Sequence, residues 1–378
     1  MAPKASPKKG NEGADRVHVV VRIRPPVRKD EKFGEGSEAL QVDREKNMIF
    51  LLAENEERSL NPKQFAFDRV LWKDAVQSDA WEAAGVSVTK AVMEGYTGCV
   101  MCYGQTGAGK TYTLANDKPG QEGVMIQAFN FIFASADNER ELKYEVQLSY
   151  QQIYLDGISD LLQPSAPVEL REDPKEGVYV SGARWETVTS TALAMAALNR
   201  GNSNRATAST KMNADSSRSH AVLTLSVKCT GGVRTLNGKL YLVDLAGSER
   251  VKKSGVEGAG FDEAKAINQS LTTLGRCIEV LASNKKEKAH GMGGSNPATA
   301  HCSHEHRRPL TAPAPMHTCS RALLPCIILR THMHIAPGFG PHAWAAAVPR
   351  VQADQTALQR HRRWRQDDTR GVRRAHHD

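Results

Sequence analysis

The sequence predicts an α/β protein in which helices cover both faces of a central sheet. Segments with strand-like and helix-like apolar spacing follow one another along residues 16–288. One of them, the apolar run 99–103, leads directly into a glycine-rich loop. Hydrophobic residues make up 40% of the 378 residues, which is enough for a sizeable core and excludes a chain that is disordered throughout.

Apolar residues with the spacing of β-strands recur along this region. The first such segment begins at Arg16, is rich in β-branched side chains, and ends at Pro25 and Pro26, which cannot continue a strand. A run such as 221–229 alternates apolar and polar side chains, as a half-buried strand does. The other expected strands are 64–68, 99–103, 142–154 and 240–245.

Apolar residues at helical spacing predict helices between these strands. The segment 79–96 places its large apolar side chains near one face, and we expect Gly95 and Gly98 to end it. Further helices are expected over 124–136, 191–201 and 261–283. Strands and helices mixed in this way favour a three-layer arrangement.

The two ends of the chain differ in composition from the region between them. Residues 1–15 are basic and polar, which predicts a disordered arm. The formal net charge is +8, and residues 289–378 account for +7 of it, with 12 Arg, no Lys and 11 of the 13 His. This abrupt change predicts a domain over 16–288 and an aberrant, disordered tail over 289–378.

Several classes of protein are excluded or disfavoured. No run of eighteen apolar residues is present, and the first residues lack the apolar core of a secretory signal. Seven cysteines without regular spacing do not suggest disulfides, so we expect a reduced, intracellular protein. Cys99 and Cys102 are interpreted as core thiols, and the histidines and cysteine of 301–306 as a product of biased composition rather than a zinc site.

The strongest functional signal is the glycine-rich loop. Its eight residues match G-x-x-x-x-G-K-[ST], in which backbone N–H groups surround a triphosphate. Lys110 would then reach the β- and γ-phosphates, and Thr111 would bind Mg²⁺. A glycine-rich turn with an incidental lysine is the alternative. The residues expected to contact the nucleotide are Gly104, Gln105, Thr106, Gly107, Ala108, Gly109, Lys110 and Thr111.

Two further polar segments agree with a phosphate site. Asp244 closes an apolar strand, where P-loop enzymes keep the acid that holds a Mg²⁺-bound water, and Gly247 is placed so that its N–H could contact a γ-phosphate. The segment Asn213–His220 combines hydroxyl groups, an arginine and a histidine, which suits a phosphate and metal neighbourhood. Taken alone, an aspartate capping a turn and an ordinary serine-rich loop would explain them equally well.

Together, these three segments resemble the kinesin motor domain. Kinesins carry GQTGxGKT, NxxSSRSH and DLAGSE in this order, and here the matching segments are Gly104–Thr111, Asn213–His220 and Asp244–Glu249. The resemblance extends to VRIRP at 21–25, SYQQIY at 149–154 and EAKAIN at 263–268. It covers about residues 16–288. The implied fold is a three-layer P-loop NTPase with a central, mainly β-sheet flanked by helices.

The resemblance also implies roles for residues of the site. Arg24, Pro25 and Tyr112 would flank adenine, with Tyr112 stacking on the base. Arg218 and Glu249 would form an ion pair that closes when the γ-phosphate is present, and Glu249 would relay a proton from the attacking water. The implied metal ligands are Thr111, Ser217 and Asp244, and the implied catalytic residues are Lys110, Ser217, Arg218, Gly247 and Glu249.

The function that the resemblance implies is that of a microtubule-stimulated ATPase with ATP and Mg²⁺ as cofactors. The helix of about 263–283, with Lys285, Lys286 and Lys288 after it, would face acidic tubulin. We therefore expect a protein of the cytoplasm and the microtubule cytoskeleton, with neither a nucleic-acid partner nor a membrane span. A non-motile remnant that binds nucleotide or tubulin, or an unstable mis-spliced product, is the alternative.

The region after Lys288 does not resemble a kinesin. In that family the helix that corresponds to about 263–283 is called the relay helix. It is followed by a segment like HVPYRDSKLTRLL, a further helix, a central strand, a last helix and the neck linker. The sheet is therefore expected to be incomplete at its C-terminal end, although the apolar run 326–329 could pair with an open sheet edge. When residues 348–356 are back-translated and the codons are read one nucleotide forward, they permit the sequence YRESKLTRL, which resembles this family segment. We therefore expect that residues from about 289 to 346 translate a retained intron and that the rest is the motor exon read out of frame.

Overall fold

The computed structural model describes residues 17–25, 40–51, 63–139, 141–155, 157–173, 177–212, 216–232, 234–249, 266–279 and 325–333. The expected N-terminal arm, residues 213–215 of the serine-rich segment, and the tail apart from 325–333 lie outside these residues. Among the residues described, no helix combines the length and the apolar character that crossing a bilayer requires.

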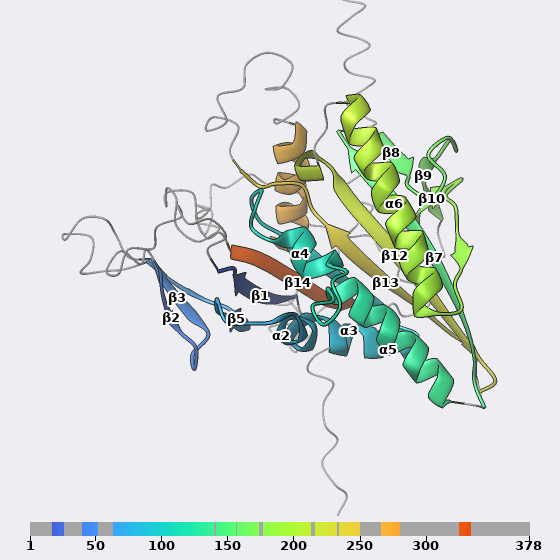
Figure 1. Ribbon diagram of the computed structural model, residues 1–378, viewed down its shortest axis with the longest axis horizontal. Helices are drawn as coiled ribbons and strands as arrows, with labels where there is room; N and C mark the ends of the chain where they lie inside the picture. The colour runs from blue at the N-terminus through green and yellow to red at the C-terminus, as the bar shows by residue number, and fades with distance from the viewer. Residues whose placement is uncertain are drawn as a thin grey trace, which may run out of the picture.

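A nine-stranded sheet forms the centre of the molecule (Figure 1). Along its main path the strand order is β11-β7-β12-β13-β6-β14-β1-β5, and β8 pairs with β7 at the side. The strands are β1 (His18–Ile23), β5 (Arg69–Leu71), β6 (Thr97–Tyr103), β7 (Lys143–Tyr154), β8 (Gly157–Asp160), β11 (Glu186–Thr187), β12 (His220–Thr230), β13 (Leu236–Asp244) and β14 (Pro325–Met333).

Two small sheets extend from the main one. One contains β2 (Leu40–Asp43), β3 (Met48–Leu51) and β4 (Lys63–Ala66), and the other pairs β9 (Glu169–Asp173) with β10 (Gly177–Ser181). All six strands that the sequence predicts are present, with β4 in the place of the short segment 64–68. The strands of the β9–β10 pair carry mostly exposed or half-buried side chains, so they lack the apolar pattern that identifies a strand.

Helices lie on both faces of the main sheet (Figure 1), which confirms the predicted three-layer arrangement. Successive residues of β6 point to opposite faces, so Val100 and Cys102 join one core cluster while Cys99 and Met101 join another. The second cluster is covered by the helix over residues 266–279. The first is covered by α2 (Gln77–Ala80), the π-helical turn η1 (Trp81–Gly85), α3 (Val86–Met93), α4 (Lys110–Ala115), α5 (Val124–Asn138) and α6 (Thr191–Met212).

Two glycines that the sequence suggests as helix ends have other roles. Gly98 lies inside β6, where a Cβ atom would come within 2.4 Å of Val88 on α3. Gly201 lies inside α6, where a Cβ atom would come within 2.3 Å of the Tyr150 ring. Each glycine therefore permits a helix to approach the sheet closely. Because of Gly201, the sequence predicts the helix 191–201, whereas α6 continues to Met212.

The strand β14 occupies the gap that the resemblance to kinesins predicts in the sheet. It runs antiparallel to β1 on one side and to β6 on the other, so that Ile328 lies opposite both Val20 and Cys102. The run 326–329 therefore pairs with the sheet as expected, but it does so as an interior strand between β1 and β6 and not at an open edge. The physical reason is that two buried strands would otherwise leave backbone N–H and C=O groups without partners.

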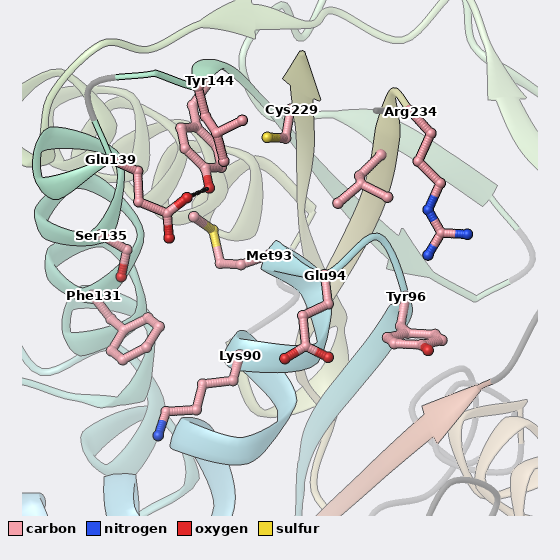
Figure 2. A pocket seen from close by; sticks show the side chains of 12 residues that line it. Lys90, Met93, Glu94, Tyr96, Phe131, Ser135, Glu139, Tyr144, Cys229 and Arg234 are labelled. Carbon is pink, nitrogen blue, oxygen red and sulfur yellow. Dashed lines mark hydrogen bonds between the residues drawn. The ribbon is translucent and has the colours of Figure 1, made fainter. Parts of the chain in front are cut away.

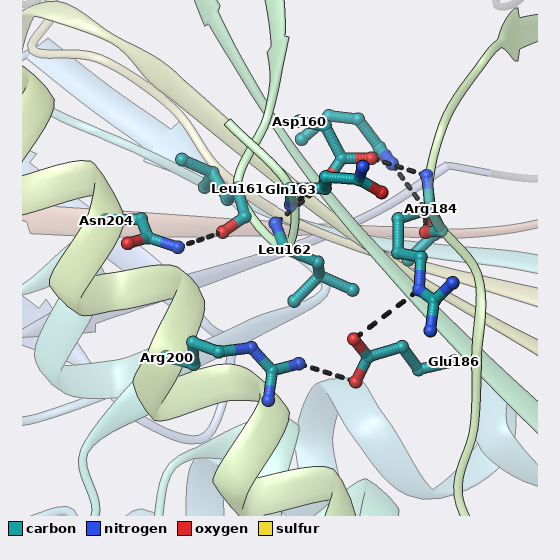
Figure 3. A network of polar contacts seen from close by, with 10 residues as sticks. Asp160, Leu161, Leu162, Gln163, Arg184, Glu186, Arg200 and Asn204 are labelled. Carbon is teal, nitrogen blue, oxygen red and sulfur yellow. Dashed lines mark hydrogen bonds and ion pairs between the residues drawn. The ribbon is translucent and has the colours of Figure 1, made fainter. Parts of the chain in front are cut away.

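A buried carboxylate organises the region where β8 ends (Figure 3). Asp160 has no exposed surface, and its Oδ1 accepts hydrogen bonds from the backbone N–H groups of Leu162 at 2.7 Å and Gln163 at 3.0 Å. Its Oδ2 accepts from the N–H of Arg184 at 2.6 Å. One side chain thus holds two separate segments of backbone together.

Replacing this carboxylate is expected to destabilise the fold. Asp160→Ala leaves three backbone donors without their acceptor, which should cost about 3 kcal/mol of unfolding free energy. Urea denaturation measures the loss. Glu186→Ala is the matched control, since it breaks the partly exposed pairs with Arg184 and Arg200 and should cost less than about 1 kcal/mol. Equal losses in the two variants would contradict the structural role of Asp160.

Candidate nucleotide site

The glycine-rich loop lies at the carboxyl end of β6, between that strand and α4. Gly107 and Gly109 have φ angles of +79° and +93°, which side chains with a Cβ atom rarely adopt. A Cβ atom placed on either glycine would meet no described atom within 4 Å, so the loop surrounds open space. The loop is therefore shaped by backbone conformation, and it leaves room for a group that its N–H donors could bind.

Lys110 contacts the loop itself. Its ammonium Nζ donates to the carbonyl oxygens of Gly104 at 2.8 Å and Gln105 at 3.1 Å, and the residue is only 7% exposed. A cation this buried is costly unless it is hydrogen-bonded, so these carbonyl contacts stabilise it. An anionic phosphate in the open loop would be a stronger partner for the ammonium than either carbonyl.

Asp244 and Thr111 are brought together although they are 133 residues apart. The reason is that β6 and β13 are parallel neighbours, so the P-loop and the end of β13 lie at the same edge of the sheet. Thr111 Oγ1 donates to Asp244 Oδ2 at 2.7 Å. Asp244 is 5% exposed, and its Oδ1 has no hydrogen-bond partner among the described residues.

These residues fit a magnesium ion with its water shell. An unpartnered carboxylate oxygen beside a threonine hydroxyl is the oxygen donor set that Mg²⁺ prefers, and this ion usually keeps several waters instead of taking a full protein cage. The part of the chain that the structure describes contains no cluster of three His, Cys, Asp or Glu side chains suited to a metal. That finding is compatible with such a site, because a hydroxyl and a single carboxylate would supply the protein ligands.

Arg205 is a residue of the candidate site that the sequence analysis missed. It lies on α6 beyond Gly201, where the sequence predicts no helix, and it is 6% exposed. Its guanidinium group contacts Asp244 Oδ2 at 3.3 Å and donates to the backbone carbonyl of Ser219 at 2.9 Å. Arg205 therefore fixes the aspartate and the end of the serine-rich segment together.

The serine-rich segment and the loop after β13 also contact each other. The short 3-10 helix η2 (Ser216–Arg218) presents the carbonyl of Ser217, which accepts from the N–H of Gly247 at 2.6 Å. The N–H of Ser248 donates to the carbonyl of Gly104 at 3.2 Å. Gly247, the predicted γ-phosphate donor, therefore joins the segment 244–249 to the serine-rich segment, and its neighbour Ser248 joins that segment to the P-loop.

The side chain of Glu249 contacts the P-loop. Its carboxylate accepts hydrogen bonds from the backbone N–H of Thr106 at 3.0 Å and from the Thr106 hydroxyl. A phosphate could accept hydrogen bonds from the same two donors, so the Glu249 carboxylate occupies a position that a phosphate could take. The ion pair of Glu249 with Arg218, which the resemblance implies, stays a prediction.

The expected adenine-binding residues lie at the end of β1 and in α4. Tyr112 is 44% exposed, so its ring is accessible for stacking, and its hydroxyl is 3.2 Å from Gln121 Oε1. Arg24 donates to the carbonyl of Pro25 at 3.1 Å. Arg22 belongs to the VRIRP segment but was given no role of its own in the sequence analysis. Its guanidinium lies 5.5 Å from the centre of the Tyr112 ring and donates to Thr113 Oγ1 at 3.1 Å.

His220 is buried where the serine-rich segment meets β12. Its Nδ1 accepts a hydrogen bond from the backbone N–H of Ala246 at 3.0 Å. Burial is the main cause that lowers the pKa of His220 to about 4, and the positive charges of Arg205 and Lys110 act in the same direction while Asp244 opposes them. The imidazole is therefore neutral at pH 7.

This low pKa predicts a pH-dependent stability. The unfolded histidine protonates near the ordinary pKa of 6.5 and the folded one near 4, so the contribution is complete above about pH 6.5 and is lost as the pH falls toward 4. The full loss should approach about 3 kcal/mol near pH 4, and about 2 kcal/mol of it should fall between pH 7 and pH 5. Urea unfolding at pH 5 and pH 7 measures it. His220→Gln should show a smaller difference between the two pH values than the unmodified chain, and equal differences would contradict the prediction.

The two cysteines before the P-loop are confirmed as core thiols. Cys99 and Cys102 are 3% and 0% exposed, and they face opposite sides of the sheet. Burial raises the pKa of Cys99 to about 12. Both thiols are therefore enclosed in the core, and the Cys99 thiol stays protonated at neutral pH.

Figure 2 shows the residues that line a second site, a cavity of about 490 Å³. It opens where α3 and α5 end, near the turn between β12 and β13, and Tyr96 at the start of β6 lines it. Tyr144 donates a hydrogen bond to Glu139 Oε2 at 2.7 Å on its wall, and burial raises the pKa of the phenol. Because the P-loop is at the opposite end of β6, this cavity is not the nucleotide site.

Comparisons with known proteins agree with the geometry. The family model described as Kinesin motor domain matches residues 22–290. Kinesin-1 heavy chain of Homo sapiens is 42% identical over 229 residues, covering 58% of this chain and 24% of its own length. Kinesin-like protein 3 of Schizosaccharomyces pombe is 39% identical over 278 residues, covering 71% of this chain and 48% of its own length.

A solved structure gives the same result for the fold. The structure of a fast kinesin is similar with a TM-score of 0.62 and 34% identity, covering 70% of this chain and 75% of the other. That structure was described for its ATPase mechanism and its interactions with microtubules. The present chain spans between about a quarter and a half of the length of these two curated relatives.

Proposed function

Because the chain belongs to the kinesin motor domain family, we propose that residues 16–288 form an ATP-hydrolysing, microtubule-binding motor domain. The observation that carries the proposal is the contact between Thr111 and Asp244 beside an open glycine-rich loop. These are the two positions that a P-loop NTPase needs next to the terminal phosphates. A motor is better supported than a remnant or an unstable product, since the segment 244–249 contacts both the P-loop and the serine-rich segment.

The first step is binding of the triphosphate in the loop. Lys110 exchanges at least one of its carbonyl partners, Gly104 or Gln105, for an oxygen of the β- or γ-phosphate. The N–H groups of the loop supply further donors, and the exposed ring of Tyr112 stacks on adenine. Binding therefore replaces weak internal contacts by charge-assisted hydrogen bonds.

Thr111, Ser217 and Asp244 are the residues that would hold Mg²⁺. When bound, the ion neutralises charge on the β- and γ-phosphates as the bond between them breaks. Arg205 and Thr111 both contact Oδ2 of Asp244, and this orients the other carboxylate oxygen, Oδ1, as the available acceptor. The protein thus orients the ligand before the ion arrives.

The γ-phosphate competes for donors that the protein now satisfies internally. Gly247 leaves the Ser217 carbonyl to bind phosphate, and Glu249 leaves Thr106, whose N–H and hydroxyl become free. The released carboxylate then pairs with Arg218 and accepts a proton, through water, from the attacking water. Closure of the serine-rich segment and the segment 244–249 around the phosphate is in this way a consequence of phosphate binding.

The proposed partner is tubulin, and the proposed location is the cytoplasmic microtubule cytoskeleton. The described part of the contact helix, residues 266–279, lies on the face of the sheet opposite α3 and α5. It packs through Ile267, Leu271 and Leu274, which leaves its other side for a partner. The absence of a nucleic-acid partner stays an expectation.

An ATPase assay of the full chain tests this proposal. Hydrolysis is expected to rise at least about tenfold when polymerised tubulin is added, as binding energy is used to speed a slow step. Glu249→Ala should retain nucleotide binding and lose hydrolysis, because it removes the proton relay and the ion pair with Arg218 but leaves Lys110 and Thr111 to bind the phosphates and the metal. A folded chain that hydrolyses ATP at the same rate with and without microtubules would contradict the proposal.

A further inference from the structure

The imidazole of His220 connects the loop after β13 to the helix over residues 266–279. Its Nδ1 accepts from the N–H of Ala246 at 3.0 Å, and its Nε2 lies 2.9 Å from the hydroxyl of Ser270. The Ser270 hydroxyl in turn lies 2.7 Å from the carbonyl oxygen of Ile267, to which it donates. His220 is 8% exposed, so water does not compete strongly for these contacts.

The hydrogen bonds define the tautomer of the ring. Because Nδ1 accepts a backbone N–H, it carries a lone pair, and the proton of the neutral ring is on Nε2. Nε2–H then donates to Ser270, whose own proton goes to Ile267. The imidazole and the Ser270 hydroxyl each donate one hydrogen bond and accept another. The ring therefore cannot turn without breaking its hydrogen bonds to Ala246 and Ser270.

One end of this series of hydrogen bonds, at Ala246, is next to the phosphate site. Ala246 immediately precedes Gly247, whose N–H donates to the Ser217 carbonyl at 2.6 Å. A phosphate that takes this N–H shifts the peptide next to the one bonded to His220. The ring is thus one residue away from the expected point of contact with the nucleotide.

A second hydrogen bond also joins the helix to this loop, because Asn268 Nδ2 donates to the carbonyl of Glu249, but it is longer, at 3.4 Å. Ile267 and Leu271 are buried against Val243 and Leu245, and such apolar contacts hold the helix without fixing its direction. Hydrogen bonds lose strength with small changes in distance and angle. Among the described contacts, the route through His220 and Ser270 is therefore suited to transmit a small movement of the loop.

We propose that His220 is a positioning residue that couples occupation of the phosphate site to the position of helix 266–279 through Ser270. The inference rests on the proposed function, since it takes Gly247 as a contact of the γ-phosphate. It adds a specific mechanical link, formed by one neutral imidazole and one serine, between hydrolysis and the helix expected to face tubulin.

Hydrogen exchange of the full chain tests the coupling without microtubules. With Mg²⁺ present, amides of 266–279 are expected to exchange at rates that differ about five- to tenfold between ADP and a non-hydrolysable ATP analogue, the effect of one hydrogen bond made or lost. Ser270→Ala should reduce this difference to less than about twofold. Thr272→Ala is the matched control, because its hydroxyl donates to the carbonyl of Asn268, at 2.8 Å, within the same helix.

Two further readouts separate coupling from stability. Nucleotide affinity in Ser270→Ala should stay within about twofold of the unmodified chain, whereas microtubule-stimulated kcat should fall about five- to tenfold. Ser270→Thr keeps the hydroxyl and should restore both the exchange difference and kcat. A helix whose exchange still depends on the nucleotide in Ser270→Ala would overturn the coupling.

The failure of the proposed function would look different. If the unmodified chain is folded and binds neither nucleotide, the function and the coupling are both overturned. If it binds both nucleotides but 266–279 exchanges identically with each, only the coupling is overturned. If exchange behaves as expected but tubulin has no effect on hydrolysis, the coupling stands and the microtubule partner is rejected.

Discussion

Ile328→Pro is expected to unfold the centre of the sheet. Ile328 lies in β14 opposite Val20 of β1 and Cys102 of β6, so its backbone is enclosed by a strand on each side. Proline removes a ladder N–H and its ring disturbs the pairing, which interior strands do not tolerate. We expect a loss of at least about 3 kcal/mol. A thermal melt of the full chain measures it.

Thr311→Pro is the control for this prediction, because it places the same residue in the tail but outside the described sheet. It should leave the melting temperature unchanged within about 1 °C. Backbone amides of 325–333 should also exchange as slowly as those of β6 in the unmodified chain. An unchanged melt in Ile328→Pro would show that β14 is not needed for the fold.

Lys110→Ala is expected to reduce nucleotide affinity by at least about a hundredfold. The variant removes a buried ammonium that would form charge-assisted hydrogen bonds with the β- and γ-phosphates, each of which contributes about 1.5–3 kcal/mol. Fluorescence titration with a labelled ATP measures the dissociation constant. The fold should survive, since the ammonium donates to carbonyls of its own loop.

Lys90→Ala is the matched control for this variant. Lys90 also lies in a helix next to β6, but it lines the cavity at the far end of that strand. Its removal should change nucleotide affinity less than about twofold. Similar losses in both variants would indicate that general charge, and not the loop, governs binding.

Much of the nucleotide site could be predicted from the sequence because its residues lie in short contiguous patterns. The loop 104–111 and the segment 244–249 each carry their chemistry within eight residues or fewer. Their meeting follows from the parallel pairing of β6 and β13, which puts both carboxyl ends at one edge. The structure adds the contact of Thr111 with Asp244.

Arg205 could not be predicted, since its signal depends on where α6 ends. A glycine at 201 usually indicates a helix end, but here it allows the helix to approach Tyr150 and continue. The extra turns bring Arg205 beside Asp244. The packing of α6 against the sheet therefore determines that Arg205 belongs to the site, and no local sequence pattern predicts that packing.

The place of β14 could be predicted only in part. The sequence identifies the run 326–329 as apolar and able to pair, but its register and neighbours depend on the gap between β1 and β6. Those strands are separated by 73 residues, since β1 ends at Ile23 and β6 begins at Thr97. The composition of the tail as a whole predicts disorder, and only the apolar run 326–329 indicates that one segment could pair with the sheet.

Calorimetric titration of the purified full chain with ATP in the presence of Mg²⁺ tests the central claim most directly. A triphosphate held between Lys110 and Asp244 predicts saturable heat with one site per chain and a dissociation constant in the micromolar range, weakened at least about tenfold when EDTA removes the metal, because the Asp244 carboxylate then faces the phosphates unshielded. No heat at millimolar ATP from a chain that melts cooperatively would contradict the account.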